Sequence, residues 1–160
     1  MGTPELLKVV KTTCRMAAPP PNLTISQWAD RYRKLSSESC SEPGQWHTDR
    51  AEYQREIMDA VSDSAVETVV IKSSTQVGKS EIGLNMVGYH IDQDPAPMMV
   101  ILPTERDAES WSKDRFAPMV RDTLRLRGKL SGPKSRDSSN KILHKKFVGG
   151  QLTLVGSNAP

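Results

Sequence analysis

Cysteine, aromatic residues and long apolar runs are all scarce in this chain of 160 residues. Its only two cysteines, Cys14 and Cys40, lie far apart without a further cysteine or histidine at metal-ligand spacing, so the sequence supports neither a disulfide framework nor a zinc site. No apolar run approaches the roughly 20 residues that span a bilayer, and the N-terminus lacks the apolar core of a signal peptide. We therefore expect two free thiols, a cytoplasmic location and no membrane partner.

Charge is distributed unevenly along the chain. Residues 1–112 carry 11 Lys and Arg against 16 Asp and Glu, a balance of −5, whereas residues 113–146 carry 11 against 3, a balance of +8. If the basic side chains share a face, they attract the phosphates of double-stranded DNA by counterion release; otherwise they form a solvated surface. Arg121, Arg125 and Lys129 have i, i+4 spacing and would form one DNA-binding stripe if the helix extends so far.

Proline and helical periodicity divide the chain near residue 21. Residues 1–21 contain a short helical pattern followed by "AAPPP", which predicts an arm and a stiff proline-rich linker. Residues 22–160 are long enough for one domain with a core. There, Thr24 and Gln27 have capping-box spacing at the start of a predicted helix, and a second helical pattern covers residues 51–63.

The middle of the chain alternates between strand and helix patterns. The β-branched run in "ETVVIKSS", residues 67–74, predicts a central parallel strand that is buried on both faces, and "MMVILPT" predicts a second buried strand. A helix follows each strand. The first helix contains Gly83 and Gly88, whose cost in a helix predicts close packing against the sheet or against a ligand. The second helix begins after Thr104, a suitable N-cap.

The C-terminal pattern "KILHKKFVGGQLTLVGS" predicts two short strands joined at Gly149 and Gly150, because two glycines permit a tight hairpin turn. The element order predicts an α/β fold with a mostly parallel sheet, helices on both faces and a C-terminal β-hairpin. Asp92 and Asp94, which follow a predicted helix, are expected to be turn and surface residues.

A loop between the first predicted strand and its helix resembles a phosphate-binding loop. The Walker A pattern G-x-x-x-x-G-K-[ST] is met except at the first glycine, where this chain has Ser73. A strand, small residues and a helix N-terminus are what such a loop needs, so we expect a partial P-loop NTPase core; the alternative is a chance match in a turn. The candidate ATP-binding residues are Ser73, Ser74, Thr75, Gln76, Val77, Gly78, Lys79 and Ser80. Lys79 would contact the terminal phosphates and the Ser80 hydroxyl would bind Mg²⁺.

Three segments together resemble a known family. They are "SQWADRYRKLSSESCSEPGQWHTDRAEYQREIMDAV", "VVIKSSTQVGKSE" and "ILPTERDAESWSKDRFAPMV". Their order is similar to that in the lambda-type phage terminase large subunit, and the resemblance covers residues 22–160. It implies an ATP-driven motor that packages DNA into phage heads, followed by a nuclease domain, in the cytoplasm of the bacterial host. The implied partners are double-stranded DNA, the terminase small subunit and further copies of the motor.

The resemblance also implies roles for individual residues. Some family members place the functional lysine at the front of the loop, which here is Lys72, so Lys72 stays a second candidate beside Lys79. Tyr53 and Gln54 match positions that recognise adenine, although Tyr53 is alternatively a core residue of a helix. Thr104 and Arg106 match a loop that contacts the DNA backbone; the alternative is an N-capped helix with a solvated arginine.

No predicted strand ends in the acidic residues that ATP hydrolysis requires. The resemblance places the Walker B pair, and the nuclease carboxylates after it, beyond Pro160, so the catalytic residues are unknown. We therefore expect residues 22–160 to be an incomplete P-loop ATPase domain, truncated before Walker B and without turnover by itself. The alternative is a non-catalytic fragment or module that binds the small subunit, through residues 1–21, or DNA.

Overall fold

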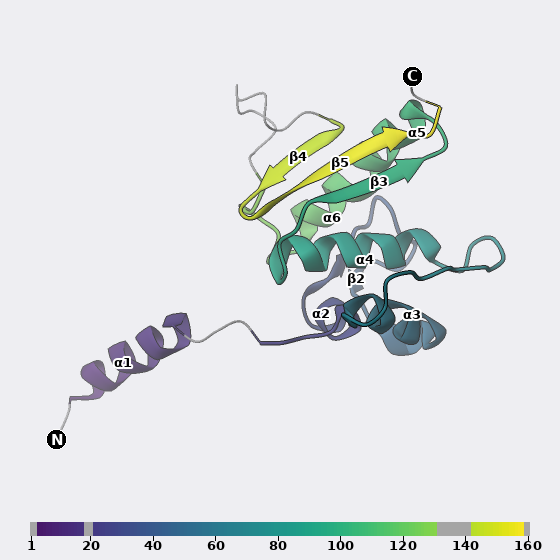
Figure 1. The fold of residues 1–160 in the computed structure, drawn as a ribbon. Helices are drawn as coiled ribbons and strands as arrows, with labels where there is room; N and C mark the ends of the chain where they lie inside the picture. The colour runs from purple at the N-terminus through teal and green to yellow at the C-terminus, as the bar shows by residue number, and fades with distance from the viewer. Residues whose placement is uncertain (1–2, 18–20, 131–141, 159–160) are drawn as a thin grey trace.

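The computed structural model describes residues 3–17, 21–130 and 142–158, and the basic residues at 134–141 lie outside it. The first helix, α1 (Pro4–Ala17), lies apart from the rest of the described chain (Figure 1). It confirms the predicted helix of the arm. Its leucines and valines Leu6, Leu7, Val9 and Val10 are 49–64% exposed, so nothing within the described chain covers its apolar side.

Two short helices form the base of the domain. Helix α2 (Ile25–Tyr32) begins with the predicted capping box at Thr24, and α3 (Tyr53–Ser62) packs beside it. Two-residue strands β1 (Lys34–Leu35) and β2 (Gly44–Gln45) and the 3₁₀ helix η1 (Thr48–Ala51) connect them.

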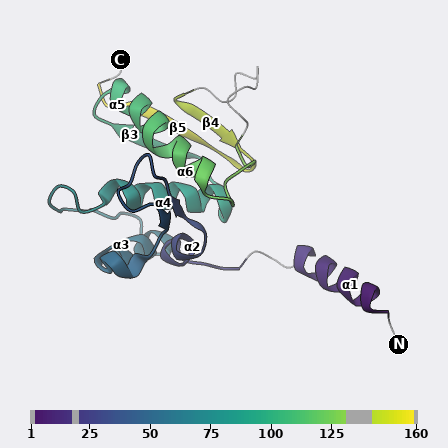
Figure 2. The ribbon, with the colours of Figure 1, turned by 180° about the vertical axis from the view of Figure 1, so that it is seen from behind.

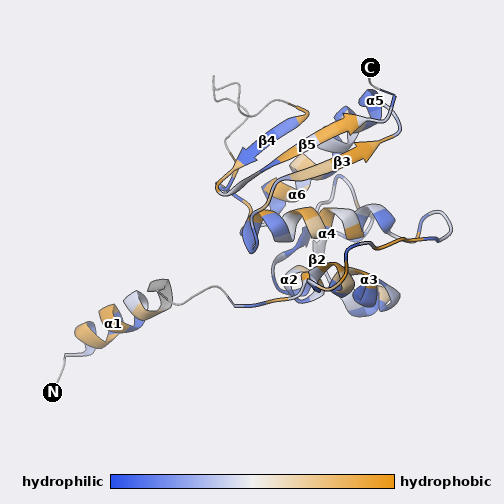
Figure 3. Cartoon of the chain, in the orientation of Figure 1, coloured by the Kyte–Doolittle hydropathy of each residue, from blue (hydrophilic) through white to orange (hydrophobic). Residues whose placement is uncertain are grey.

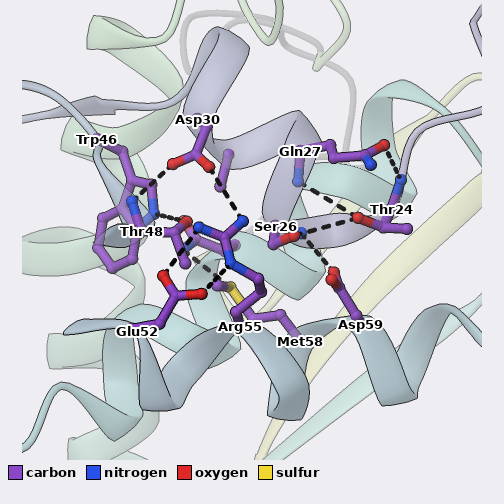
Figure 4. Close-up of polar contacts among 12 residues, drawn as sticks. Thr24, Ser26, Gln27, Asp30, Trp46, Thr48, Glu52, Arg55, Met58 and Asp59 are labelled. Carbon is purple, nitrogen blue, oxygen red and sulfur yellow. Dashed lines mark hydrogen bonds and ion pairs between the residues drawn. The ribbon is translucent and has the colours of Figure 1, made fainter. Parts of the chain in front are cut away.

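Polar contacts fix α2 against α3 (Figure 4). The backbone N–H of Ser26 donates to the Asp59 carboxylate at 3.2 Å, and the N–H of Thr48 donates to Asp30 at 2.6 Å. Arg55 on α3 lies 3.7 Å from Asp30, at the far end of α2. The N-terminal end of α3 is thereby held in one orientation.

Helix α4 (Lys79–Asp92) is the most deeply buried element. Its apolar residues Ile82, Leu84, Val87 and Ile91 are all at most 5% exposed. A Cβ atom at Gly88 would lie 2.5 Å from the Trp28 ring, so Gly88 is closely packed, but against α2 and not against the predicted sheet. At Gly83 a Cβ atom would meet nothing within 4 Å, so the predicted packing against the sheet is wrong there, and contact of Gly83 with a ligand stays a prediction.

The sheet has three strands in the order β3-β5-β4, formed by β3 (Met98–Leu102), β4 (His144–Phe147) and β5 (Gly150–Gly156). β3 and β5 are parallel, and β4 and β5 form the predicted antiparallel hairpin, with Gly149 at a φ of 87° in its turn. The described sheet is therefore mixed, and the prediction of a mostly parallel sheet is wrong.

Helices cover only one face of the described sheet. The continuous helical segment α5 (Glu105–Ser110), η2 (Trp111–Phe116, a π-helix) and α6 (Ala117–Asp122) packs behind the strands in the view of Figure 1, and in front of them in Figure 2. On the opposite face, Met99 and Ile101 are 63% and 64% exposed. The orange that marks hydrophobic residues is visible on β3 in Figure 3. The prediction of helices on both faces is therefore wrong for the described residues, and β3 is only half-buried.

The predicted strand at residues 67–74 does not form. This segment is irregular, no ladder pairs it with another strand, and Val70 is 84% exposed. A strand needs a neighbour for its backbone N–H and C=O groups, and neither edge of the described sheet supplies one. No helix in the described ranges is long and apolar enough to cross a membrane.

Candidate nucleotide-binding site

The candidate loop makes a sharp turn into the N-terminus of α4. Gln76 has a φ of 61° and Gly78 has a φ of 78°, so two residues of the loop adopt left-handed conformations within three positions. Gly78 caps α4 without a side chain, and its carbonyl accepts the N–H groups of Glu81 and Ile82. The first N–H groups of a helix have no partner within the helix, so this end of α4 is suited to an anion.

Tyr53 and Gln54 hold the loop from the side of α3. The Tyr53 hydroxyl donates to the Val77 carbonyl at 2.9 Å, and the Gln54 amide nitrogen donates to the same oxygen at 3.1 Å. A Cβ atom at Gly78 would lie 2.5 Å from the Gln54 amide nitrogen, so this close approach itself requires glycine. Because Tyr53 and Gln54 lie on α3, the polar contacts that hold α3 against α2 also help to place the loop.

The two residues differ in their exposure. Tyr53 is 57% exposed, so the alternative prediction that it packs in the core is wrong. Gln54 is 3% exposed, and its buried Oε1 atom has no hydrogen-bond partner among the described residues. A buried acceptor without a partner costs free energy, so this oxygen marks a place where a donor is missing.

The two candidate lysines occupy different settings. The Lys79 ammonium group donates to the Ser74 carbonyl and so closes the loop upon itself. Lys72 is exposed, and no hydrogen bond or ion pair joins it to another described residue. Ser80 is exposed in the first turn of α4. The geometry brings together Lys79, Ser80 and the loop backbone, and it leaves the choice between the two lysines open.

Sequence reasoning missed an ion cluster next to the loop. Arg33 is 2% exposed, and its guanidinium lies 2.9 Å from one carboxylate oxygen of Glu81, the residue after Ser80. Arg115 lies 3.8 Å from the other oxygen of Glu81. Burial lowers the pKa of Arg33, while the neighbouring Glu81 carboxylate opposes that change. Arg33 is the C-cap residue of the amphipathic helix α2, where charged residues are common, so no signal in the sequence distinguished it from a solvent-exposed arginine.

The first group of predicted DNA-binding residues lies at the start of α5. Thr104 caps this helix: its hydroxyl accepts the N–H of Asp107 at 3.1 Å, and Asp107 accepts the N–H of Thr104 at 3.1 Å. Arg106 is exposed. The structure thus contains the N-capped helix that was the alternative reading, and a DNA contact by Thr104 and Arg106 stays a prediction.

The predicted helical stripe of Arg121, Arg125 and Lys129 is wrong, because α6 ends at Asp122. Arg121 contacts Asp122 and Glu38 across the surface. Arg125 and Lys129 instead both form ion pairs with the same carboxylate. A role of these three residues in DNA binding stays a prediction, without the geometric support that motivated it.

That carboxylate belongs to Asp92, whose side chain is fully buried, so its prediction as a surface residue is wrong. Its oxygens lie 2.6 Å from Lys129 and 3.2 Å from Arg125, and it accepts the Trp28 indole N–H at 2.9 Å. Burial raises the pKa of Asp92, but the hydrogen bonds from Lys129, Trp28 and Gln93 outweigh burial, and the net pKa lies below the ordinary value.

The remaining chemistry of ATP hydrolysis is not found in the described residues. Strand β3 runs into Pro103 and β5 ends at Gly156, so neither strand ends in a carboxylate. No group of three or more His, Cys, Asp or Glu residues gathers as metal ligands in the part of the chain that the structure describes. Phosphate binding at the N-terminus of α4 stays a prediction, and neither described strand supplies the carboxylate that ATP hydrolysis requires.

The described residues form an α/β protein in which a glycine turn leads into the N-terminus of a buried helix. Comparison with known proteins narrows this class. Residues 40–160 match the family described as phage terminase large subunit gpA, ATPase domain. The chain is 31% identical over 149 residues to the terminase large subunit of Escherichia phage lambda, an alignment that covers 92% of this chain and 23% of that protein.

A second relative is the terminase large subunit of Enterobacteria phage P21, which is 31% identical over 134 residues, covering 82% of this chain and 20% of the relative. No solved structure matches. The chain belongs to the phage terminase large subunit gpA family, within its ATPase domain. This confirms the resemblance found in the sequence, and the chain spans less than a quarter of the length of these two relatives.

Proposed function

We propose that residues 73–80 bind ATP with Mg²⁺ and that the chain is the N-terminal part of a motor that packages viral DNA. The observation that carries this proposal is the buried Gln54 Oε1 atom next to the loop, which has no hydrogen-bond partner among the residues that the structure describes. Adenine has an exocyclic amino group that supplies the missing donor. The neighbouring Tyr53, whose side chain is exposed, would stack on the base.

The other parts of the nucleotide have counterparts on the loop. The free N–H groups at the start of α4 would bind the phosphates, and Lys79 or Lys72 would add a positive charge. The Ser80 hydroxyl would help to hold Mg²⁺, whose positive charge would offset the negative charge of the phosphates. The Lys79 contact with the Ser74 carbonyl has to break before this ammonium group reaches a phosphate.

The wider role of the protein is also a proposal. Family membership supports ATPase activity of the complete motor in the cytoplasm of a bacterial host, with double-stranded DNA, the terminase small subunit and further copies of the motor as partners. Turnover would require the Walker B carboxylates, and DNA maturation would require a nuclease domain. We assign the DNA-facing role to Thr104 and Arg106 first.

A second candidate function is that of a module that binds the small subunit without catalysis. The observation that favours it is α1, which presents four exposed aliphatic side chains apart from the domain. Isolated apolar side chains on a surface are common, but an uncovered helical stripe is suited to a partner. This arm function and nucleotide binding are compatible with each other in one chain.

Titration with a fluorescent ATP analogue and Mg²⁺ tests the main proposal. We expect the parent chain to bind, and Lys79→Ala or Lys72→Ala to weaken binding about tenfold or more, according to which lysine contacts phosphate. Lys11→Ala on α1 removes the same charge far from the loop and is the matched control. Equal binding by all four proteins would contradict a phosphate site at residues 73–80.

Deleting residues 1–21 tests the second candidate function. The deletion should leave nucleotide binding intact and, if the arm is a docking site, abolish recovery of the small subunit in a pull-down.

A further inference from the structure

Glu81 presents an electrostatic problem for the proposed site. It lies in the first turn of α4, immediately after Ser80, where the helix dipole favours negative charge. In the absence of nucleotide a carboxylate at this position stabilises the helix. A nucleotide brings several negative charges to the same end of α4, so an unpaired Glu81 would repel its phosphates.

The buried Arg33 forms an ion pair with the Glu81 carboxylate. Its guanidinium donates to a Glu81 oxygen at 2.9 Å and, through Nε, to the Asn85 side-chain oxygen at 3.2 Å, and it also contacts the Lys34 carbonyl. Asn85 is fully buried and one turn further along α4. Every nitrogen of the guanidinium is therefore directed by a separate acceptor, and Arg33 has little freedom to turn toward another anion.

Arg115 approaches the same carboxylate from outside. It lies on the π-helix η2, its guanidinium donates to the Ser39 carbonyl at 2.9 Å, and it is 3.8 Å from the second oxygen of Glu81. Its side chain is 45% exposed. Two arginines that are 82 positions apart in the sequence, from Arg33 to Arg115, thus each face one oxygen of Glu81.

We propose that Arg33 and Arg115 act as positioning residues that neutralise Glu81 and keep the N-terminus of α4 attractive to nucleotide phosphates. This inference rests on the proposed nucleotide function and deepens it. The two arginines do not contact the nucleotide in this scheme; they act through Glu81. Arg115 also makes the affinity of the loop depend on the position of η2, because the guanidinium reaches Glu81 only from that helix.

The rescue of one charge change by another tests this arrangement. Because Arg115 is partly exposed, Arg115→Gln should fold, and we expect it to weaken binding of a fluorescent ATP analogue with Mg²⁺ about two- to fivefold at low salt. Adding Glu81→Gln removes the uncompensated carboxylate, so the double variant should regain at least the parent affinity. Arg121→Gln is the matched control, because it removes the same charge from a surface ion pair with Glu38 and should match the parent.

Two results would overturn the inference alone. The first is a double variant as weak as Arg115→Gln, which would show that the arginine contacts the nucleotide itself. The second is an Arg115→Gln affinity equal to that of the Arg121→Gln control. A parent chain that binds no nucleotide overturns the proposed function, and the inference with it. Arg33→Gln with Glu81→Gln supplies a further check, because this pair leaves no unpaired charge in the buried site and should bind as tightly as Glu81→Gln alone.

Discussion

At the scale of single residues, two glycines of α4 have opposite environments. Gly88 touches the Trp28 ring, whereas Gly83 faces open space. We expect Gly88→Ala to lower the free energy of unfolding by about 1–3 kcal/mol, because the added methyl group displaces a packed indole. Gly83→Ala should raise it by up to about 1 kcal/mol, because alanine is the better helix former. Chemical denaturation of both variants measures these changes.

The two substitutions are chemically identical and lie on the same helix, so each is the control for the other. Equal effects on stability would contradict the packing of α4 against Trp28. Trp28 fluorescence adds a local readout, since Gly88→Ala should shift the emission of the buried indole and Gly83→Ala should not.

At the scale of elements, the Asp92 carboxylate joins α2, the C-terminal end of α4 and the residues that follow α6. The pKa of Asp92 in the folded protein is lowered. The ionised carboxylate therefore stabilises the fold above the unfolded-state pKa of about 4, and this stabilisation is lost as the pH falls through the folded-state pKa. We expect Asp92→Asn to destabilise the protein by about 1–3 kcal/mol at pH 7, and by progressively less as the pH falls below about 4.

Asp94→Asn is the matched control for this prediction, because Asp94 is 72% exposed and two positions away. Thermal unfolding of the parent and both variants at pH 7 and at pH 3 gives the comparison. A constant difference between the parent and Asp92→Asn at both pH values would show that the ionised carboxylate does not stabilise the junction.

At the scale of the whole molecule, the distribution of basic residues bears on DNA. Arg125 and Lys129 are already paired with Asp92, so they release few counterions on binding, whereas Arg106 is exposed. We expect sequence-independent affinity for duplex DNA that falls steeply with salt. Arg106→Ala should reduce the slope of log K against log salt by about 0.9, the value for one phosphate contact.

The comparison variant combines Arg125→Ala and Lys129→Ala with Asp92→Asn, so that no buried carboxylate is left without a partner. We expect its salt slope to equal that of Asp92→Asn alone. Binding to mixed-sequence duplex over a salt series measures both slopes. A decrease near 1.8 in the comparison variant would restore Arg125 and Lys129 as phosphate contacts.

Local signals in the sequence predicted much of this fold. The capping box predicted at Thr24 and the N-cap predicted at Thr104 both form, since a cap depends on residues only three positions apart. The hairpin at Gly149 forms because its turn is equally local. The strand predicted at residues 67–74 fails for the converse reason: β-branched residues favour a strand, but its backbone groups need a neighbouring strand that propensity cannot provide.

The sequence by itself determined most of the helices, the hairpin and the position of the candidate loop, because short-range periodicity, capping and turn chemistry specify each of them. Tertiary structure decided what the loop is held by and what surrounds it. Only folding brings Gln54 to the Val77 carbonyl, Arg33 and Arg115 to Glu81, and Lys129 to the buried Asp92. These contacts join residues that are 23 to 48 positions apart, and pairing at such separations depends on packing, which leaves no periodic trace in the sequence.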